Sequence, residues 1–168
     1  MSGKISITVL ITLTLLATSA LGQTPQKINQ FDYWGAYSYK NHKNTLCYIL
    51  STPTEQQPST VKHGDNFFLL SKKIAAKKIT FEPQFMAGYT LKKNSRVNLS
   101  IGNKNFSMFT KNTSAWIDTN KGELNLVAAM KKGKSLTVQA ISERGTNTTY
   151  TYSLKGITAA IDAIQKCK

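Results

Sequence analysis

Cysteine and histidine are the residues of this chain best suited to nucleophilic or metal chemistry, and each occurs twice. Cys47 and Cys167 have no CxxC partner and no protease signature around them. Two cysteines also cannot build a structural zinc site alone. His42 and His63 both stand in polar loop contexts, where a lone histidine is most often solvated. The sequence therefore predicts no catalytic thiol and no metal site.

Motifs of the common enzyme classes are missing as well. The sequence contains no HExxH, GxSxG, GxGxxG or P-loop pattern. Its eight Asp and Glu residues are scattered singly, so no close pair of carboxylates is available for glycosidase chemistry. We expect a protein that is not an enzyme and that needs no cofactor.

Positive charge is the most unusual property of the composition. The formal net charge is +14, and between residues 66 and 117 Glu82 is the only acid against nine basic residues. A field of this kind favours acidic partners such as lipopolysaccharide phosphates, acidic glycans or sialic acids of a host surface. The candidate binding residues are Lys72, Lys73, Lys77, Lys78, Lys92, Lys93 and Arg96. The alternative is a solvated surface that the charge keeps soluble.

Lysine outnumbers arginine among these cations, which bears on how an acidic partner is held. Only Arg96 and Arg144 offer a guanidinium fork that matches a carboxylate or phosphate in two places. Charge carried mostly by lysine predicts diffuse, salt-sensitive attraction. The two tryptophans, Trp34 and Trp116, are interpreted as core or strand-anchoring residues, with ligand stacking as the less favoured alternative.

Residues 1–22 have the pattern of a secretory signal peptide. Lys4 supplies the positive first region, residues 5–17 are apolar, and Ala20-Leu21-Gly22 places small residues before a cleavage site at Gln23. A retained transmembrane anchor would need about 20 apolar residues, and several threonines and serines interrupt this segment. We expect a single domain over residues 23–168 with no transmembrane segment after cleavage. Export to the periplasm or cell surface also makes nucleic acid an unexpected partner.

Export would bring both cysteines into an oxidising compartment, where thiols pair and persist. A Cys47–Cys167 disulfide would close a loop of about 120 residues, for a nominal stabilisation of about 4–5 kcal/mol. Two free buried thiols, or an intermolecular bridge, are the open alternatives.

Most of the mature chain has the alternation of short strands. Residues 31–39, 45–51 and 66–71 are predicted to be strands. Because proline cannot donate a hydrogen bond to a neighbouring strand, Pro83 predicts that the strand around residues 79–85 lies at a sheet edge or contains a bulge. Residues 96–101 and 106–109 form a predicted hairpin around Gly102-Asn103, and residues 136–141 and 149–154 form a second pair. Such spacing suggests an all-β sandwich.

Two segments have helical periodicity instead. Residues 122–132 end in Lys131-Lys132-Gly133, a typical helix terminus with cations and a glycine stop. Near the C-terminus, Ile157, Ala160, Ile161 and Ile164 fall on one helical face. The sequence predicts a mainly β fold with one short internal helix and a C-terminal amphipathic helix packed on the sheets.

Several stretches, in this order, resemble the invasion-associated locus B family of Gram-negative bacteria. They are Trp34 upstream of Cys47; Ser51-Thr52-Pro53 with Pro58; Met86-Ala87-Gly88-Tyr89 with Leu91; residues 106–116, ending in Ala115-Trp116; Leu126-Val127-Ala128-Ala129-Met130-Lys131-Lys132-Gly133; Ser142 with Arg144-Gly145-Thr146; Tyr152-Ser153-Leu154-Lys155-Gly156; and Ala160 with Cys167. The stretches cover nearly the whole mature chain.

The resemblance implies an immunoglobulin-like β-sandwich, a periplasmic or surface location, and a part in entry into host cells, notably erythrocytes. The family has no established catalytic residues, so none is carried over. One departure is visible: an acidic residue is common just before the family's final Tyr-Ser-Leu strand, where Tyr150 and Thr151 stand here.

Overall fold

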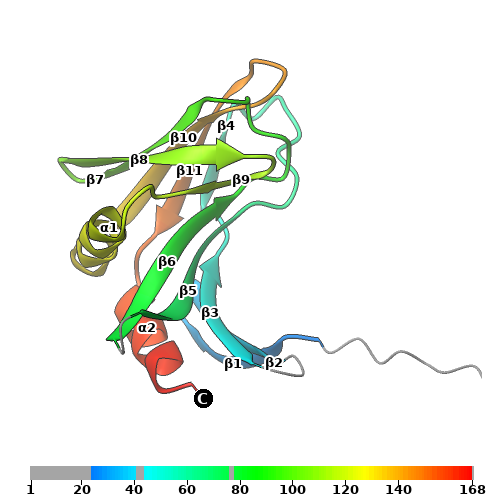
Figure 1. Ribbon diagram of the computed structural model, residues 1–168. Helices are drawn as coiled ribbons and strands as arrows, with labels where there is room; N and C mark the ends of the chain where they lie inside the picture. Colours follow the sequence, from blue (N-terminus) through cyan, green and yellow to red (C-terminus); the bar gives the residue numbers. More distant parts are fainter. Residues whose placement is uncertain (1–23, 41–43, 76–77, 168) are drawn as a thin grey trace, which may run out of the picture.

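The fold is a single antiparallel sheet with two helices, seen in a computed structural model that describes residues 24–40, 44–75 and 78–167 (Figure 1). The predicted signal peptide lies outside the described residues. The sheet order is β1-β2-β3-β5-β6-β9-β8-β7-β10-β11-β4. The elements are β1 (Gln26–Phe31), β2 (Trp34–Lys40), β3 (Thr45–Ser51), β4 (Glu55–Gln57), β5 (Phe67–Ala75), β6 (Lys78–Met86), β7 (Arg96–Ile101), β8 (Lys104–Lys111), β9 (Ser114–Trp116), α1 (Asn120–Lys132), β10 (Ser135–Ile141), β11 (Asn147–Ser153) and α2 (Ile157–Lys166).

The sheet is folded over, so that the strands at the start of the sheet order pack against those near its end. The two parts form the layers of a sandwich. Phe85 of β6 meets Tyr150 of β11 with ring centroids 5.6 Å apart. Trp34 of β2 is fully buried, and its indole N–H donates to the carbonyl oxygen of Ser153 at 2.9 Å. These contacts join residues of strands far apart in the sheet order. The mainly β sandwich expected from the sequence is confirmed.

The N-terminal part differs from the expected single strand over residues 31–39. β1 ends at Phe31 and β2 begins at Trp34, with a two-residue turn between them. Asp32 takes a positive φ of 46°, which aspartate tolerates better than most residues. Alternation of aromatic and small residues continues through the turn, so the sequence pattern hid it.

Pro83 does not interrupt β6. The strand pairs with β5 along its whole length, whereas β9 pairs only with its last three residues, Gln84–Met86. The outer edge of β6 at Pro83 therefore has no partner strand among the described residues. Of the two alternatives, the edge position is confirmed and the bulge is wrong.

Both predicted helices are present. α1 begins two residues earlier than expected, after Thr119, whose hydroxyl oxygen accepts a hydrogen bond from the backbone N–H of Gly122. In α2, the four residues on the predicted face are all buried, and the helix packs on β1, β2 and β3. Neither helix, within the described chain, is long and apolar enough to cross a membrane.

The two cysteines form the predicted disulfide. Cys47 of β3 and Cys167, at the end of α2, are bonded with their Cα atoms 6.3 Å apart, and no described cysteine is free. Free thiols and an intermolecular bridge are therefore wrong alternatives. The bond ties α2 to the sheet.

Candidate functional site

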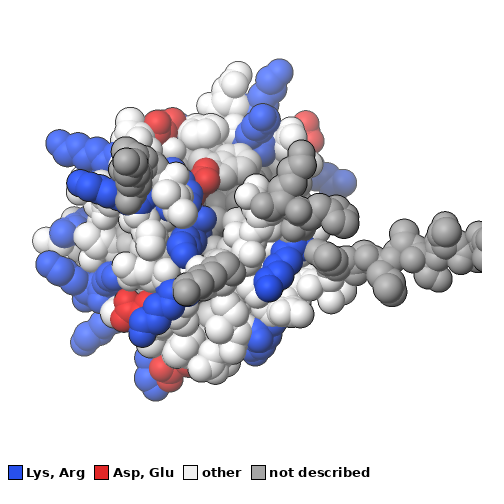
Figure 2. All heavy atoms as spheres, turned by 60° about the horizontal axis from the view of Figure 1, so that its bottom comes forward, with Lys and Arg blue, Asp and Glu red and all other residues white. Residues whose placement is uncertain are grey.

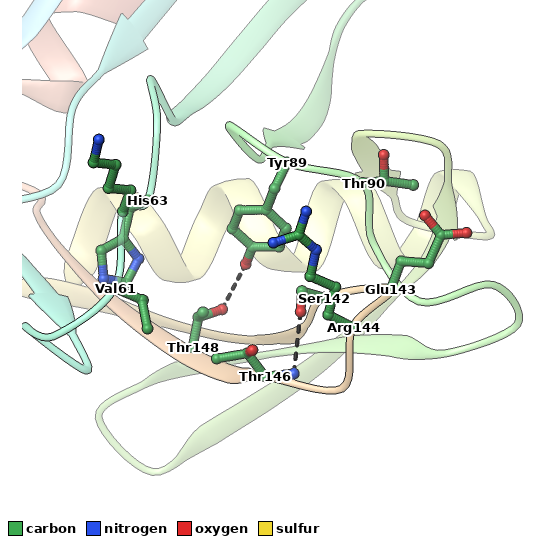
Figure 3. A pocket seen from close by; sticks show the side chains of 10 residues that line it. Val61, His63, Tyr89, Thr90, Ser142, Glu143, Arg144, Thr146 and Thr148 are labelled. Atoms are coloured by element: carbon green, nitrogen blue, oxygen red, sulfur yellow. Dashed lines mark hydrogen bonds between the residues drawn. The ribbon is translucent and has the colours of Figure 1, made fainter.

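A polar hollow at one end of the sandwich is the best candidate site. It encloses about 470 Å³ where three loops meet: residues 61–63, residues 89–90, and the turn between β10 and β11 (Figure 3). The lining residues are Val61, Lys62, His63, Tyr89, Thr90, Ser142, Glu143, Arg144, Thr146 and Thr148.

Two glycines bring the first two loops together. Gly64 has a positive φ of 66°, and a Cβ on Gly88 would lie only 2.4 Å from the carbonyl oxygen of His63. No side chain fits there, because atoms this close would overlap. The close approach places His63 and Tyr89 on adjoining walls of the hollow.

His63 is buried, with 9% of its surface exposed, so the expectation of a solvated loop histidine is wrong. Its Nε2 lies 2.9 Å from the carbonyl oxygen of Pro58 and its Nδ1 lies 2.9 Å from the Tyr150 hydroxyl. Because a carbonyl oxygen only accepts, Nε2 must carry a hydrogen. Both ring nitrogens are thus engaged within the protein. His42, the other histidine, lies outside the described residues.

The hydrogen-bond chain continues from Tyr150 to the floor of the hollow. Tyr150 donates to the hydroxyl of Tyr89 at 3.2 Å, Tyr89 bonds to the Thr148 hydroxyl, and Thr148 donates to the carbonyl oxygen of Ala140 at 3.3 Å. Burial raises the pKa of Tyr150 well above its usual value, and its bond to Tyr89 adds to this rise. The hydrogen bonds to Tyr150 and Thr148 therefore fix the orientation of the Tyr89 phenol.

The chain between Pro58 and Ala140 has five links and ends in a carbonyl oxygen at each side. It connects the loop that ends at His63 to β10 through the side chains of Tyr150, Tyr89 and Thr148.

The third wall is the turn between β10 and β11. The backbone N–H groups of Gly145 and Thr146 donate to the carbonyl and the hydroxyl oxygen of Ser142, at 2.8 and 3.1 Å. The N–H of Glu143 donates to the carbonyl oxygen of Thr90 at 2.9 Å, joining this turn to the second loop. Arg144 of this turn lines the hollow together with Tyr89 (Figure 3).

The two arginines have different surroundings. Arg96 of β7 forms a two-point ion pair with Asp118 and also donates to Ser107. The pair raises the pKa of Arg96 and lowers that of Asp118, chiefly through their hydrogen bond. Arg144 has no ion-pair or side-chain hydrogen-bond partner among the described residues. Within the described residues, therefore, the guanidinium of Arg144 is open to a ligand and that of Arg96 is not.

Two of the predicted basic residues on β5 hold the fold together. Lys72 Nζ donates to the backbone carbonyl oxygens of Gln165 at 3.0 Å and Cys167 at 2.6 Å. Lys73 Nζ lies 2.7 Å from a carboxylate oxygen of Glu123, which is buried at the start of α1. These contacts explain two of the candidate cations without any partner molecule.

The remaining candidates do not form one patch. Lys77 lies outside the described residues. Lys78 begins β6, whereas Lys92 and Lys93 follow its other end, and this nine-residue strand is roughly 25 Å long. All three are exposed, and Figure 2 shows basic side chains spread around one face of the molecule between uncharged ones. The structure thus places Lys78 far from Lys92 and Lys93.

The tryptophans have the expected structural positions. Trp34 lies in the core, and Trp116 of β9 is partly buried and stacks on Phe109 of β8, with centroids 5.9 Å apart. Among the described residues, no group of three His, Cys, Asp or Glu could hold a metal ion.

Comparison with known protein families decides the relationship of this chain. The family model described as invasion associated locus B (IalB) protein matches residues 34–165, well over half of the sequence. The chain belongs to the IalB family. No curated protein and no solved structure matches it. The resemblance recognised in the sequence is thereby confirmed, and the protein is invasion-associated by family.

The hollow includes residues that sequence reasoning left out of the candidate site, namely Lys62, His63, Tyr89 and Arg144. A signal was present: Gly88-Tyr89 and Arg144-Gly145-Thr146 are two of the stretches that carry the IalB resemblance. They are more than 50 residues apart in sequence and adjoin in the fold.

Proposed function

We propose that this IalB-family chain is an exported, non-enzymatic protein that assists the entry of a bacterium into host cells of the erythrocyte type. It acts by binding a partner at the cell envelope or the host surface. Family membership over residues 34–165 is the observation that carries the proposal. An unknown protein, an acidic glycan and lipopolysaccharide are the partners that its charge favours.

A binding role is supported by the chemistry of the hollow. The two nitrogens of His63 are bonded to Pro58 and Tyr150, so the imidazole has no nitrogen left to serve a bound molecule as a base. The fork of Arg144, in contrast, faces no partner within the described chain. The arrangement suits recognition of an acid better than proton transfer.

Export to the periplasm or the outer surface is part of the proposal. It is supported by the signal-peptide pattern of residues 1–22 and by the Cys47–Cys167 disulfide, since such bonds persist in oxidising compartments. Fractionation of cells that produce the full chain, with N-terminal sequencing of the exported form, tests this part. The expected form begins at Gln23.

The entry role is tested by deleting the gene and counting intracellular bacteria, with growth in broth and envelope integrity measured in parallel. Reduced entry with normal growth and a normal envelope supports the proposal. Unchanged entry contradicts it. Entry lost only together with envelope damage favours the alternative, a periplasmic structural or chaperone-like protein that affects invasion indirectly.

A further inference from the structure

The open guanidinium of Arg144 points to the ligand class of the hollow. Arg96 uses its fork on Asp118 and Ser107, whereas Arg144 is exposed at the rim with no side-chain partner in the described part of the chain. A guanidinium fork matches a carboxylate with two parallel hydrogen bonds. Backbone N–H groups of the turn that carries Arg144 donate hydrogen bonds to Ser142 and Thr90. These bonds hold the backbone at Arg144 in place.

The charge of the lining fits an anion with one negative charge. Lys62 and Arg144 contribute two positive charges and Glu143 contributes one negative charge, which leaves a net charge of +1. A carboxylate balances this charge, whereas a phosphate monoester, with nearly two negative charges, exceeds it. The carboxylate of Glu143 can also accept hydrogen bonds from the hydroxyls of a ligand.

Hydroxyl groups make up much of the remaining surface. Ser142 Oγ accepts from the N–H of Thr146, which leaves its own hydrogen for a ligand. The hydroxyls of Thr90 and Thr146 have no partner among the described residues. The ring of Tyr89 and the side chain of Val61 also line the hollow and add apolar surface (Figure 3).

We infer that the hollow binds a carboxylated sugar, with the carboxylate on Arg144 and the ring hydroxyls on Ser142, Thr90 and Glu143. A sugar combines one acidic group with many hydroxyls and an apolar ring face, and each has a counterpart here. The volume of about 470 Å³ falls within the range of about 300–1,000 Å³ typical of small-molecule sites. This inference rests on the proposed function, and it names the chemical class of the partner that the protein would bind.

Binding to the purified, oxidised mature chain tests the inference, with glucuronic acid and N-acetylneuraminic acid as probes and glucose as the neutral control. Titration calorimetry or amide chemical shifts should show binding of an acidic sugar and none of glucose. Arg144→Ala should weaken it at least about tenfold, because a charge-assisted two-point contact is lost. Arg144→Lys should recover only part, since an ammonium is not a fork.

Lys78→Ala is the matched control, because Lys78 is also an exposed cation but lies outside the hollow. Equal losses in the Arg144 and Lys78 variants would show a diffuse charge effect and overturn the inference. It is overturned too if neither acidic sugar binds at millimolar concentration, or if glucose 6-phosphate binds as well as the carboxylated sugars.

The entry assay separates this inference from the proposed function. If the deletion strain enters host cells poorly and the Arg144→Ala gene restores entry fully, the entry role stands and the role of the hollow is overturned. If Arg144→Ala behaves like the deletion while the folded protein is exported normally, both are supported.

Discussion

Gly64 and Gly88 lie backbone against backbone, although 24 residues separate them in sequence. A Cβ on Gly88 would lie 2.6 Å from the carbonyl carbon of Gly64, and one on Gly64 would lie 2.7 Å from the carbonyl oxygen of Gly88. Backbone atoms cannot rotate away as a side chain can. This contact holds two walls of the hollow together.

Gly88→Ala is therefore expected to destabilise the fold by about 2–3 kcal/mol, the upper part of the range for overpacking, because the atoms it would meet are backbone. Urea unfolding of the purified protein measures the change. Gly145→Ala is the control: it has a positive φ of 86° but open space around it, so only the strain of that conformation, about 1 kcal/mol, is expected. Equal effects of the two changes would contradict the contact.

Loss of the disulfide should lower the free energy of unfolding substantially. The bond closes a loop with a sequence separation of 120, which corresponds to about 4–5 kcal/mol in the chain-entropy description. Urea titrations of the wild type and of the Cys47→Ala, Cys167→Ala double variant give the difference. Intact mass after alkylation without reductant is the companion measurement, and addition of label to two thiols would show that the bond is absent in the purified protein.

Lys73 should matter to stability more than its position on the surface suggests. Its ammonium pairs with Glu123, whose side chain is only 9% exposed, so Lys73→Ala leaves a carboxylate in a poorly solvated place. We expect a cost of about 1–3 kcal/mol, reduced by the partial exposure of Lys73 itself. Lys78→Ala, which removes a cation without a described partner, should change stability by less than about 0.5 kcal/mol. Thermal unfolding of both variants decides between a paired and a merely solvated Lys73.

Alkaline pH should unfold the protein and ionise its buried tyrosines together. Burial raises the pKa of Tyr152, whose hydroxyl donates to the buried Asn66 at 3.1 Å, and it also raises that of Tyr150. Since the pKa is higher in the folded chain than the ordinary value near 10 in the unfolded one, the contribution to stability is complete below pH 10. It is lost as the pH rises above 10.

Tyrosinate absorbance and far-ultraviolet circular dichroism, followed together, check this prediction. Two tyrosines should ionise only with the loss of β structure. Tyr152→Phe should make the fall of unfolding free energy above pH 10 shallower. Ionisation of all seven tyrosines in the folded protein would contradict the buried positions.

The exposed lysines allow a direct test of charge-driven surface binding. Reversal of Lys78, Lys92 and Lys93 to glutamate should weaken binding to vesicles with anionic lipid without loss of stability, because none of the three has a described side-chain partner. Binding of the wild type should fall as ionic strength rises past about 0.15 M. Reversal of Lys72 or Lys73 is not suitable, since it would break contacts to α2 and α1. Vesicle binding by the triple variant at the wild-type level would assign these lysines to solubility alone.

Local patterns in the sequence were sufficient for several elements. Gly102-Asn103 between alternating residues predicted the β7–β8 hairpin, and the spacing of Ile157, Ala160, Ile161 and Ile164 predicted the buried face of α2. The pairing of Cys47 with Cys167 followed from there being two cysteines and a predicted export signal. In each case neighbouring residues, or a simple count, contain the information.

Three-dimensional contacts decided the candidate site. Whether an arginine is paired depends on whether a carboxylate from a distant segment reaches it, as Asp118 reaches Arg96 and no described residue reaches Arg144. His63 follows a polar loop in sequence, yet it is buried because Gly64 and Gly88 bring two loops into contact and Tyr150 bonds to its ring. Sequence thus determined the elements and the amount of charge, whereas packing between distant segments determined which charges are already neutralised and which remain open to a ligand.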